Sequence, residues 1–296
     1  MHRIARIAIA ALASVGMLAS VAACGSGQST SKKNGTIEVA ASVNQWGTVA
    51  KALGGDNVNV TSIINSTNVD AHDYEPTTSD IAKLQKAQVI IVNGAGYDAW
   101  AVKAAQSANA TIVNAAAVGG VNDGENPHVW FSADVRKAVA QAITEAYEQA
   151  DAAKKNDFDK MNDQWAAEEN NVESKIAEVK QKTDGLAYAA TESVASYLAE
   201  DMGLADATPS GYARATANES EPTPTDIKQF TDALKAGEIK LLVVNTQEES
   251  ELTGKITDAA KSVEVPMVEL TEQMPEQYDS LTDWMAALVD AFSQAI

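Results

Sequence analysis

The chain has 296 residues and a formal net charge of −19 at pH 7, with 41 acidic residues against 22 basic ones. Such an acidic protein lacks the positive surface that neutralises phosphate groups, which excludes nucleic acid as a partner. It has a single cysteine, Cys24, which excludes an internal disulfide.

The N-terminus has the pattern of an export signal. Arg3 and Arg6 precede an apolar stretch and small residues, with no acidic group before Cys24. The stretch is shorter than the ~20 residues of a membrane-spanning helix, so residues 1–23 are predicted to be a signal peptide. Loss of its two arginines lowers the formal net charge from −19 to −21. Residues 24–34 are polar and predict a flexible tether.

The run Val21–Gly25 resembles the lipobox of bacterial lipoproteins. This resemblance implies that Cys24 is lipidated and that the protein is extracytoplasmic, anchored to the cell membrane as a lipoprotein. The alternative is an ordinary signal peptide followed by an incidental free cysteine.

Residues 35–150 are predicted to form a first α/β lobe. Helix-like stretches at Ser79–Lys86 and Ala99–Ala108 lie between or beside short β-branched runs. The alternation predicts a parallel sheet covered by helices. The predicted strands are Thr36–Ala41, Val58–Ile64, Val89–Val92 and Thr111–Val113.

A long helix is predicted within residues 151–184. From Phe158 to Val179 the apolar residues recur at steps of three, four or seven, on a background rich in charged and amide side chains. This spacing is typical of one amphipathic helix.

Residues 185–296 are predicted to form a second α/β lobe, because the alternation of short apolar runs and helix-like stretches resumes there. The fold class is therefore α/β, with two parallel-sheet lobes joined by one long backbone helix and a ligand site between them. The predicted elements are strands at Leu186–Ala190, Ile239–Asn245 and Val265–Leu270, helices at Val194–Met202 and Ser250–Ser262, and a last helix that follows the third of these strands and ends at Ile296.

A short motif occurs once in each lobe. The run Glu75–Ile81 reads EPTTSDI and the run Glu221–Ile227 reads EPTPTDI. Each predicts a loop that leads into a helix with a capping box, Asp replacing the usual Glu. The position that matches His72 in the second copy is Asn218. Either the lobes are related and only one copy kept the histidine, or the match of seven residues is chance.

Histidine is scarce, which makes its placement informative. Of three histidines, His2 lies in the predicted signal peptide, so the mature chain keeps His72 and His128. Each lies in a short polar loop that contains proline, where an imidazole is available as a metal ligand. The alternative is a pair of hydrogen-bonded surface histidines.

In open α/β sheets, ligands bind beyond the carboxyl ends of the strands. Four candidates follow predicted strands there: His72, His128, Glu192 and, in the loop after Val265–Leu270, Asp279. Two come from each lobe, so they could converge on one divalent cation in a cleft. Two nitrogen and two carboxylate ligands suit manganese, iron or zinc better than calcium or magnesium, which prefer oxygen alone.

Several motifs together resemble a known family from about Thr36 to the C-terminus. They are HDYEPT from His72, NPHVW from Asn126, NGAGYDAW from Asn93, TESV from Thr191 and NTQ from Asn245. They resemble the metal-binding lipoproteins of bacterial ABC importers for zinc and manganese. The resemblance implies two α/β lobes joined by a rigid helix, and delivery of the ion to a membrane permease with a cytoplasmic ATPase.

The resemblance also implies ligand positions. His72, His128 and Glu192 match them directly. The fourth is usually an aspartate in an Asp-Ser/Thr-Tyr run, which aligns best with Asp279, although Leu281 replaces the tyrosine. Glu276 is held in reserve for that position.

The cargo is expected to be Zn(II) or Mn(II), with Fe(II) as a further candidate. Zinc carriers of the family often have a long His-rich and acidic loop before the second histidine motif, and some have a third histidine at the position of Glu192. This chain has neither, which favours manganese or iron, but zinc binds such ligands more tightly than manganese does.

Three functions compete. The first is a monomeric solute-binding lipoprotein that is not an enzyme and presents a transition-metal ion to an ABC importer. The second is a surface metallohydrolase, which needs an open coordination position, a bound water and a general base. The third is an adhesin-like surface protein, with a role in cell adhesion, whose metal is structural.

Overall fold

The computed structural model describes residues 35–69 and 71–296. The predicted signal peptide of residues 1–23, the lipidation of Cys24 and the tether of residues 24–34 lie outside this part of the chain. Within it, no helix is both long and apolar enough to cross a membrane.

The first lobe contains a four-stranded parallel sheet, as the sequence predicts. Its strand order is β2-β1-β3-β4, and Val39 in the central strand β1 pairs with Val60 on one side and Val89 on the other. Both neighbours of β1 are parallel to it, so all the carboxyl ends meet at one edge. The strands are β1 (Ile37–Val43), β2 (Val58–Ile64), β3 (Val89–Val92) and β4 (Thr111–Asn114).

The second lobe repeats this topology. Its parallel sheet has the order β6-β5-β7-β8, which is the same sequence of crossovers as in the first lobe. The two-residue edge strand β6 is too short and too polar to be recognised in the sequence. The strands are β5 (Ala187–Ala190), β6 (Ala205–Asp206), β7 (Leu241–Asn245) and β8 (Met267–Leu270).

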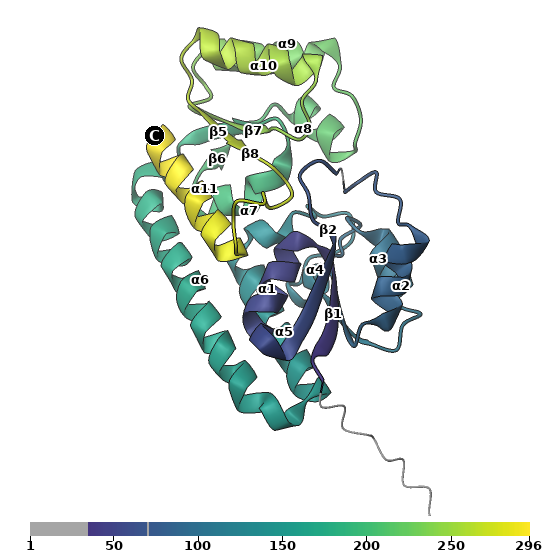
Figure 1. Ribbon diagram of the computed structural model, residues 1–296. Helices are drawn as coiled ribbons and strands as arrows, with labels where there is room; N and C mark the ends of the chain where they lie inside the picture. The colour runs from purple at the N-terminus through teal and green to yellow at the C-terminus, as the bar shows by residue number, and fades with distance from the viewer. Residues whose placement is uncertain (1–34, 70) are drawn as a thin grey trace, which may run out of the picture. The chain divides into compact units, whose positions relative to one another are not determined.

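Helices and short 3₁₀ turns connect and cover the strands (Figure 1). In the first lobe these are α1 (Asn44–Gly54), η1 (Gly55–Asn57), α2 (Thr78–Lys86), α3 (Ala99–Ala105), α4 (Ala115–Val118), η2 (Val129–Phe131), α5 (Ala133–Ala150) and η3 (Ala152–Lys154). In the second they are η4 (Ser193–Ala195), α7 (Ser196–Asp201), α8 (Ser210–Ala217), α9 (Pro224–Lys235), α10 (Glu251–Ser262) and α11 (Leu281–Ala295).

The two copies of the capping motif occupy equivalent places. Thr77 and Asp80 close a capping box at the start of α2, and Thr223 and Asp226 close one at the start of α9. Helix α2 lies between β2 and β3, whereas α9 lies between β6 and β7. Both motifs therefore lie in the crossover between the second and third strands of their lobe in chain order, which favours related lobes over a chance match.

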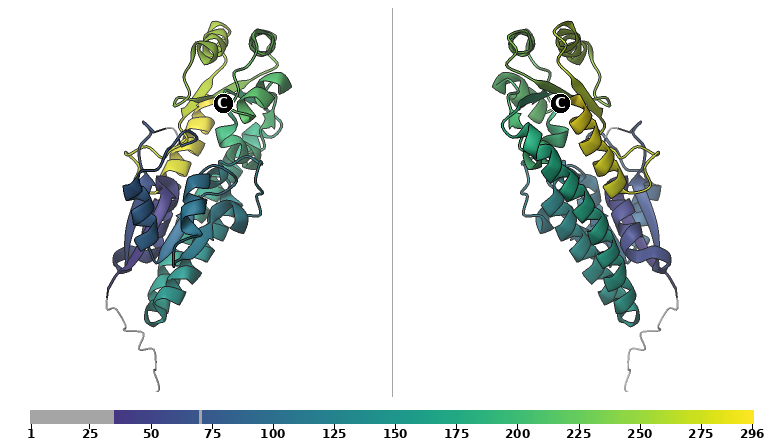
Figure 2. Two further views of the ribbon diagram at one scale, coloured as in Figure 1. Left: turned by 90° about the vertical axis from the view of Figure 1, so that its right-hand side faces the viewer. Right: turned by 90° about the vertical axis from the view of Figure 1, so that its left-hand side faces the viewer.

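Helix α6 (Lys155–Thr183) is the predicted long helix, and its 29 residues span about 44 Å. Its buried stripe includes Phe158, Trp165, Val172 and Val179, and the helix runs beside both lobes, against α5 and α11 (Figure 2). These residues belong to one apolar cluster that continues from the first lobe into the second. A shared core of this kind holds the two sheets in a fixed relation within Gly35–Ile296, which form one compact unit.

A buried ion pair ties α6 to α5. The guanidinium of Arg136 binds both carboxylate oxygens of Glu169, and both side chains are fully buried. Arg136 Nη1 also donates to the carbonyl oxygen of Trp130, at 3.0 Å. Through Arg136, helix α6 is therefore linked to the turn η2, which begins one residue after His128.

Candidate metal centre

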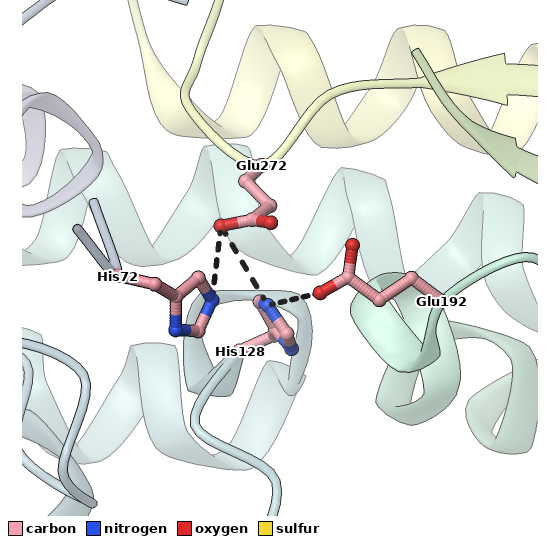
Figure 3. Close-up of side chains that lie close together, drawn as sticks. All are labelled: His72, His128, Glu192 and Glu272. Atoms are coloured by element: carbon pink, nitrogen blue, oxygen red, sulfur yellow. Dashed lines mark ion pairs between the residues drawn. The ribbon is translucent and has the colours of Figure 1, made fainter. Parts of the chain in front are cut away.

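Four side chains converge between the sheets: His72, His128, Glu192 and Glu272 (Figure 3). Each offers one donor atom, and these atoms lie within 4.8 Å of one another. The two histidines come from loops after β2 and β4, and the two glutamates follow β5 and β8. Each lobe thus contributes two donors from the carboxyl edge of its sheet, where open α/β sheets bind their ligands.

Three of the distances between donor atoms are compatible with ligands that share one ion. Oε2 of Glu272 lies 3.5 Å from Nε2 of His72 and 3.8 Å from Nε2 of His128. Oε1 of Glu192 lies 3.8 Å from the same His128 nitrogen. Two ligands each about 2.1 Å from a metal can be at most about 4.2 Å apart. All three distances satisfy this limit.

His128 is held with Nε2 ready to donate its lone pair. Oδ1 of Asn126 accepts from the backbone N–H of His128 and lies 2.7 Å from Nδ1 of the ring. Nδ2 of the same Asn126 side chain donates to the backbone carbonyl of Ser193, and this bond fixes the orientation of the Asn126 amide. Nδ1 must therefore carry the proton. Nε2 is buried and has no hydrogen-bond partner among the described residues.

The carboxylates are oriented by amide and phenol groups. Nδ2 of Asn245 donates to Oε2 of Glu192 at 2.6 Å and contacts Oε1 of Glu272 at 3.3 Å. The hydroxyl of Tyr97 donates to Oε2 of Glu272 at 2.8 Å, and Gln45 on α1 donates to the backbone carbonyl of Glu272. These contacts turn one oxygen of each carboxylate toward the imidazoles, as outer partners do in metal sites.

Burial and charge shift the protonation of the cluster. Burial lowers the pKa of His72, but the carboxylates of Glu272, Glu192 and Glu219 outweigh it and raise that pKa from 6.5 to about 9. Burial and the charge of Glu272 raise the pKa of Glu192 from 4.5 to about 7. Burial also acts to raise the pKa of Glu272, but the two imidazoles hold it well below its usual range. The metal-free cluster therefore holds protons that a cation would replace.

Residues 39–295 match the profile of the family described as zinc-uptake complex component A, periplasmic, or ZnuA. The chain belongs to this family. The match extends from the first strand to the last helix, so it includes both sheets and every residue of the cluster.

Relatives of this ZnuA-family chain are named as carriers of different metals. The manganese ABC transporter substrate-binding lipoprotein PsaA of Streptococcus anginosus is 24% identical over 245 residues, which cover 76% of this chain and 77% of PsaA. The iron ABC transporter substrate-binding lipoprotein MtsA of Streptococcus pyogenes serotype M1 is 25% identical over 234 residues, 72% of this chain and 73% of MtsA.

A solved structure shows the same fold. The periplasmic zinc-binding protein TroA of Treponema pallidum superposes with a TM-score of 0.74 at 14% identity, covering 88% of this chain and 99% of TroA. The expected architecture, with two parallel-sheet lobes and one long connecting helix, is therefore confirmed for this ZnuA-family chain.

The structure brings together three of the four residues that the sequence nominated, His72, His128 and Glu192, but not the fourth. Asp279 is exposed and lies outside the cluster, in a surface hollow beside Lys51 of α1 and Ser62 of β2. Glu276, the reserve candidate, is exposed and outside the cluster as well. The fourth place is taken by Glu272.

A local rule explains this correction. Glu272 comes two residues after the end of β8, as Glu192 comes two residues after the end of β5. A side chain this close to a strand end lies at the carboxyl edge of the sheet. Asp279, seven residues after Glu272, lies instead near the start of α11. The equal spacing of the two glutamates is visible in the sequence and makes Glu272 a further candidate beside Asp279 and Glu276.

Proposed function

We propose that this protein is an extracytoplasmic solute-binding lipoprotein that captures one divalent transition-metal ion on His72, His128, Glu192 and Glu272. It delivers that ion to the permease of an ABC importer driven by a cytoplasmic ATPase. The observation that carries the proposal is the convergence of two imidazoles and two carboxylates from opposite lobes, with the lone pair of His128 directed at the carboxylates.

The donor set supports zinc or manganese as cargo, with iron as a third candidate. Two carboxylates carry two negative charges, which a dication neutralises inside a buried site. The relatives named for manganese, iron and zinc support the same group of ions. Thiolate is absent from the cluster, so a copper(I) cargo is disfavoured.

The cluster is suited to binding rather than catalysis. Four protein donors fill a tetrahedral shell, whereas a catalytic zinc keeps one position for an activated water. This disfavours the metallohydrolase alternative, and the names of the manganese and iron relatives support a carrier. A role in cell adhesion beside metal transport is supported as well, because the laminin-binding adhesin Lmb of Streptococcus agalactiae has the same fold. The site is complete within one chain, which supports a monomer, and lipidation of Cys24 would anchor it to the membrane.

A competition titration tests the proposal. Mn(II) is titrated against Zn(II) on metal-stripped protein that lacks residues 1–24, with His72→Ala beside the parent. We expect tight one-to-one binding that the variant loses. Failure of the parent to bind either ion, or equal binding by parent and variant, would overturn the carrier assignment.

Metal affinity should fall as the pH falls. The raised pKa of His72, about 9, means that this ring is protonated at pH 7 in the metal-free protein, and Glu192 gains a proton below about 7. A metal ligand must be deprotonated, so affinity should drop about tenfold per pH unit from 9 to 7 and more steeply below 7. Calorimetry in buffers of different ionisation enthalpy measures the proton release. Binding that is independent of pH would contradict this protonation scheme.

A further inference from the structure

Glu219 adopts a backbone conformation that normally favours glycine. Its φ is +51°, in the left-handed region, directly after the C-cap Asn218 of α8. The N–H of Glu219 donates to the carbonyl of Thr216, and the N–H of Ser220 donates to that of Ala215. This pair of bonds is the Schellman motif, whose left-handed position is usually glycine because a Cβ is strained there.

The side chain at this strained position reaches across to the opposite lobe. Oε1 of Glu219 lies 3.2 Å from Nδ1 of His72, and the glutamate side chain is 72% exposed while that of His72 is 18% exposed. Glu219 belongs to the second lobe and His72 to the first. The contact therefore joins the lobes at the rim of the cluster, on the side of the ring away from Glu272.

We propose that Glu219 is a positioning residue for the metal, which accepts the Nδ1–H of His72 from the other lobe and so presents Nε2 to the ion. This inference rests on the proposed function. A ring with its proton held on Nδ1 has its lone pair on Nε2, the nitrogen that faces Glu272. Asn126 does the same for His128 from within its own lobe.

A purely structural role does not account for Glu219. An exposed ion pair contributes little to folding, and the left-handed backbone opposes any residue with a Cβ. Glycine would serve the helix end better. The observation that points to function is the contact of its carboxylate with His72, 3.2 Å from Nδ1.

The chain provides a matched control in Glu264. This glutamate also has a left-handed backbone, with φ +56°, and lies at the same point of a Schellman motif after α10, with bonds to Lys261 and Ala260. Helix α10 and its following turn contribute no residue to the described cluster. Glu264→Gly thus relieves the same backbone strain without touching a ligand.

The test compares Glu219→Gly, Glu219→Gln and Glu264→Gly in the mature protein. The readouts are the melting temperature of the metal-free form and the rate of Zn(II) release to excess chelator in stopped flow. Both glycine variants should melt about 2 °C higher than the parent, because glycine accepts the left-handed backbone. Glu219→Gly alone should release Zn(II) about three- to tenfold faster. Glutamine keeps the acceptor oxygen and should stay within about twofold of the parent.

The outcomes separate this inference from the carrier assignment. If the parent binds no Zn(II), both are overturned. If the parent binds tightly but Glu219→Gly releases the ion at the parental rate, or Glu264→Gly accelerates release equally, only the role of Glu219 is overturned. Fast release from Glu219→Gln would also overturn it, because the accepting oxygen would then be irrelevant.

Discussion

Replacement of Glu272 by glutamine is expected to weaken the binding of Zn(II) and Mn(II) by between about 10²-fold and about 4 × 10³-fold. The carboxylate is buried, and its Oε2 faces both imidazoles, 3.5 Å from Nε2 of His72 and 3.8 Å from Nε2 of His128. Glutamine has the same shape but no charge, so the dication would sit in the buried site with half of its neutralising charge removed. Loss of one partner from a buried charge pair costs about 3 to 5 kcal/mol, and each ~1.4 kcal/mol is tenfold in affinity. Isothermal titration of metal-stripped protein measures the change.

Asp279→Asn and Glu276→Gln are the controls for Glu272→Gln. Both remove one carboxylate from the same loop, and both side chains are exposed and outside the cluster. They should leave the affinity within about twofold of the parent, because exposed charges are screened by solvent. A large loss in Asp279→Asn with normal binding in Glu272→Gln would restore Asp279 as the fourth ligand.

Replacement of Glu169 by glutamine is expected to lower the free energy of unfolding by about 3 to 5 kcal/mol, because it leaves the Arg136 guanidinium buried without its counter-charge. Both side chains are fully buried, and Arg136 also binds the carbonyl of Trp130 at the turn that follows His128. The loss should appear as an earlier midpoint in urea denaturation of the metal-free protein, with an unchanged slope.

A second ion pair between the same helices serves as the control. Lys137 and Glu173 also connect α5 to α6, at 2.6 Å, but their side chains are 44% and 33% exposed. Glu173→Gln should therefore cost less than about 1 kcal/mol. The double variant Arg136→Met, Glu169→Leu removes both buried charges and should recover most of the stability lost in Glu169→Gln. Equal, small effects of Glu169→Gln and Glu173→Gln would show that burial does not strengthen the first pair.

The longer strands, the long helix and the class of site were predictable from the sequence alone, because they depend on short-range patterns, whereas the two-residue strand β6 was not. Runs of β-branched residues specified the strands, and the apolar spacing from Phe158 to Val179 specified α6. The capping boxes at Thr77 and Thr223 were readable because their bonds close within four residues. His72, His128 and Glu192 could be nominated because each follows a predicted strand in a parallel sheet.

Which carboxylates lie in the cluster, and which residues contact them, depends on the tertiary structure. The loop after β8 contains Glu272, Glu276 and Asp279, and only the path of the backbone places the first in the cluster and exposes the others. The contact of Glu219 with His72 joins residues 147 positions apart, and the contact of Glu169 with Arg136 joins two separate helices. No local pattern records such contacts, because they arise only when elements distant in the chain pack together.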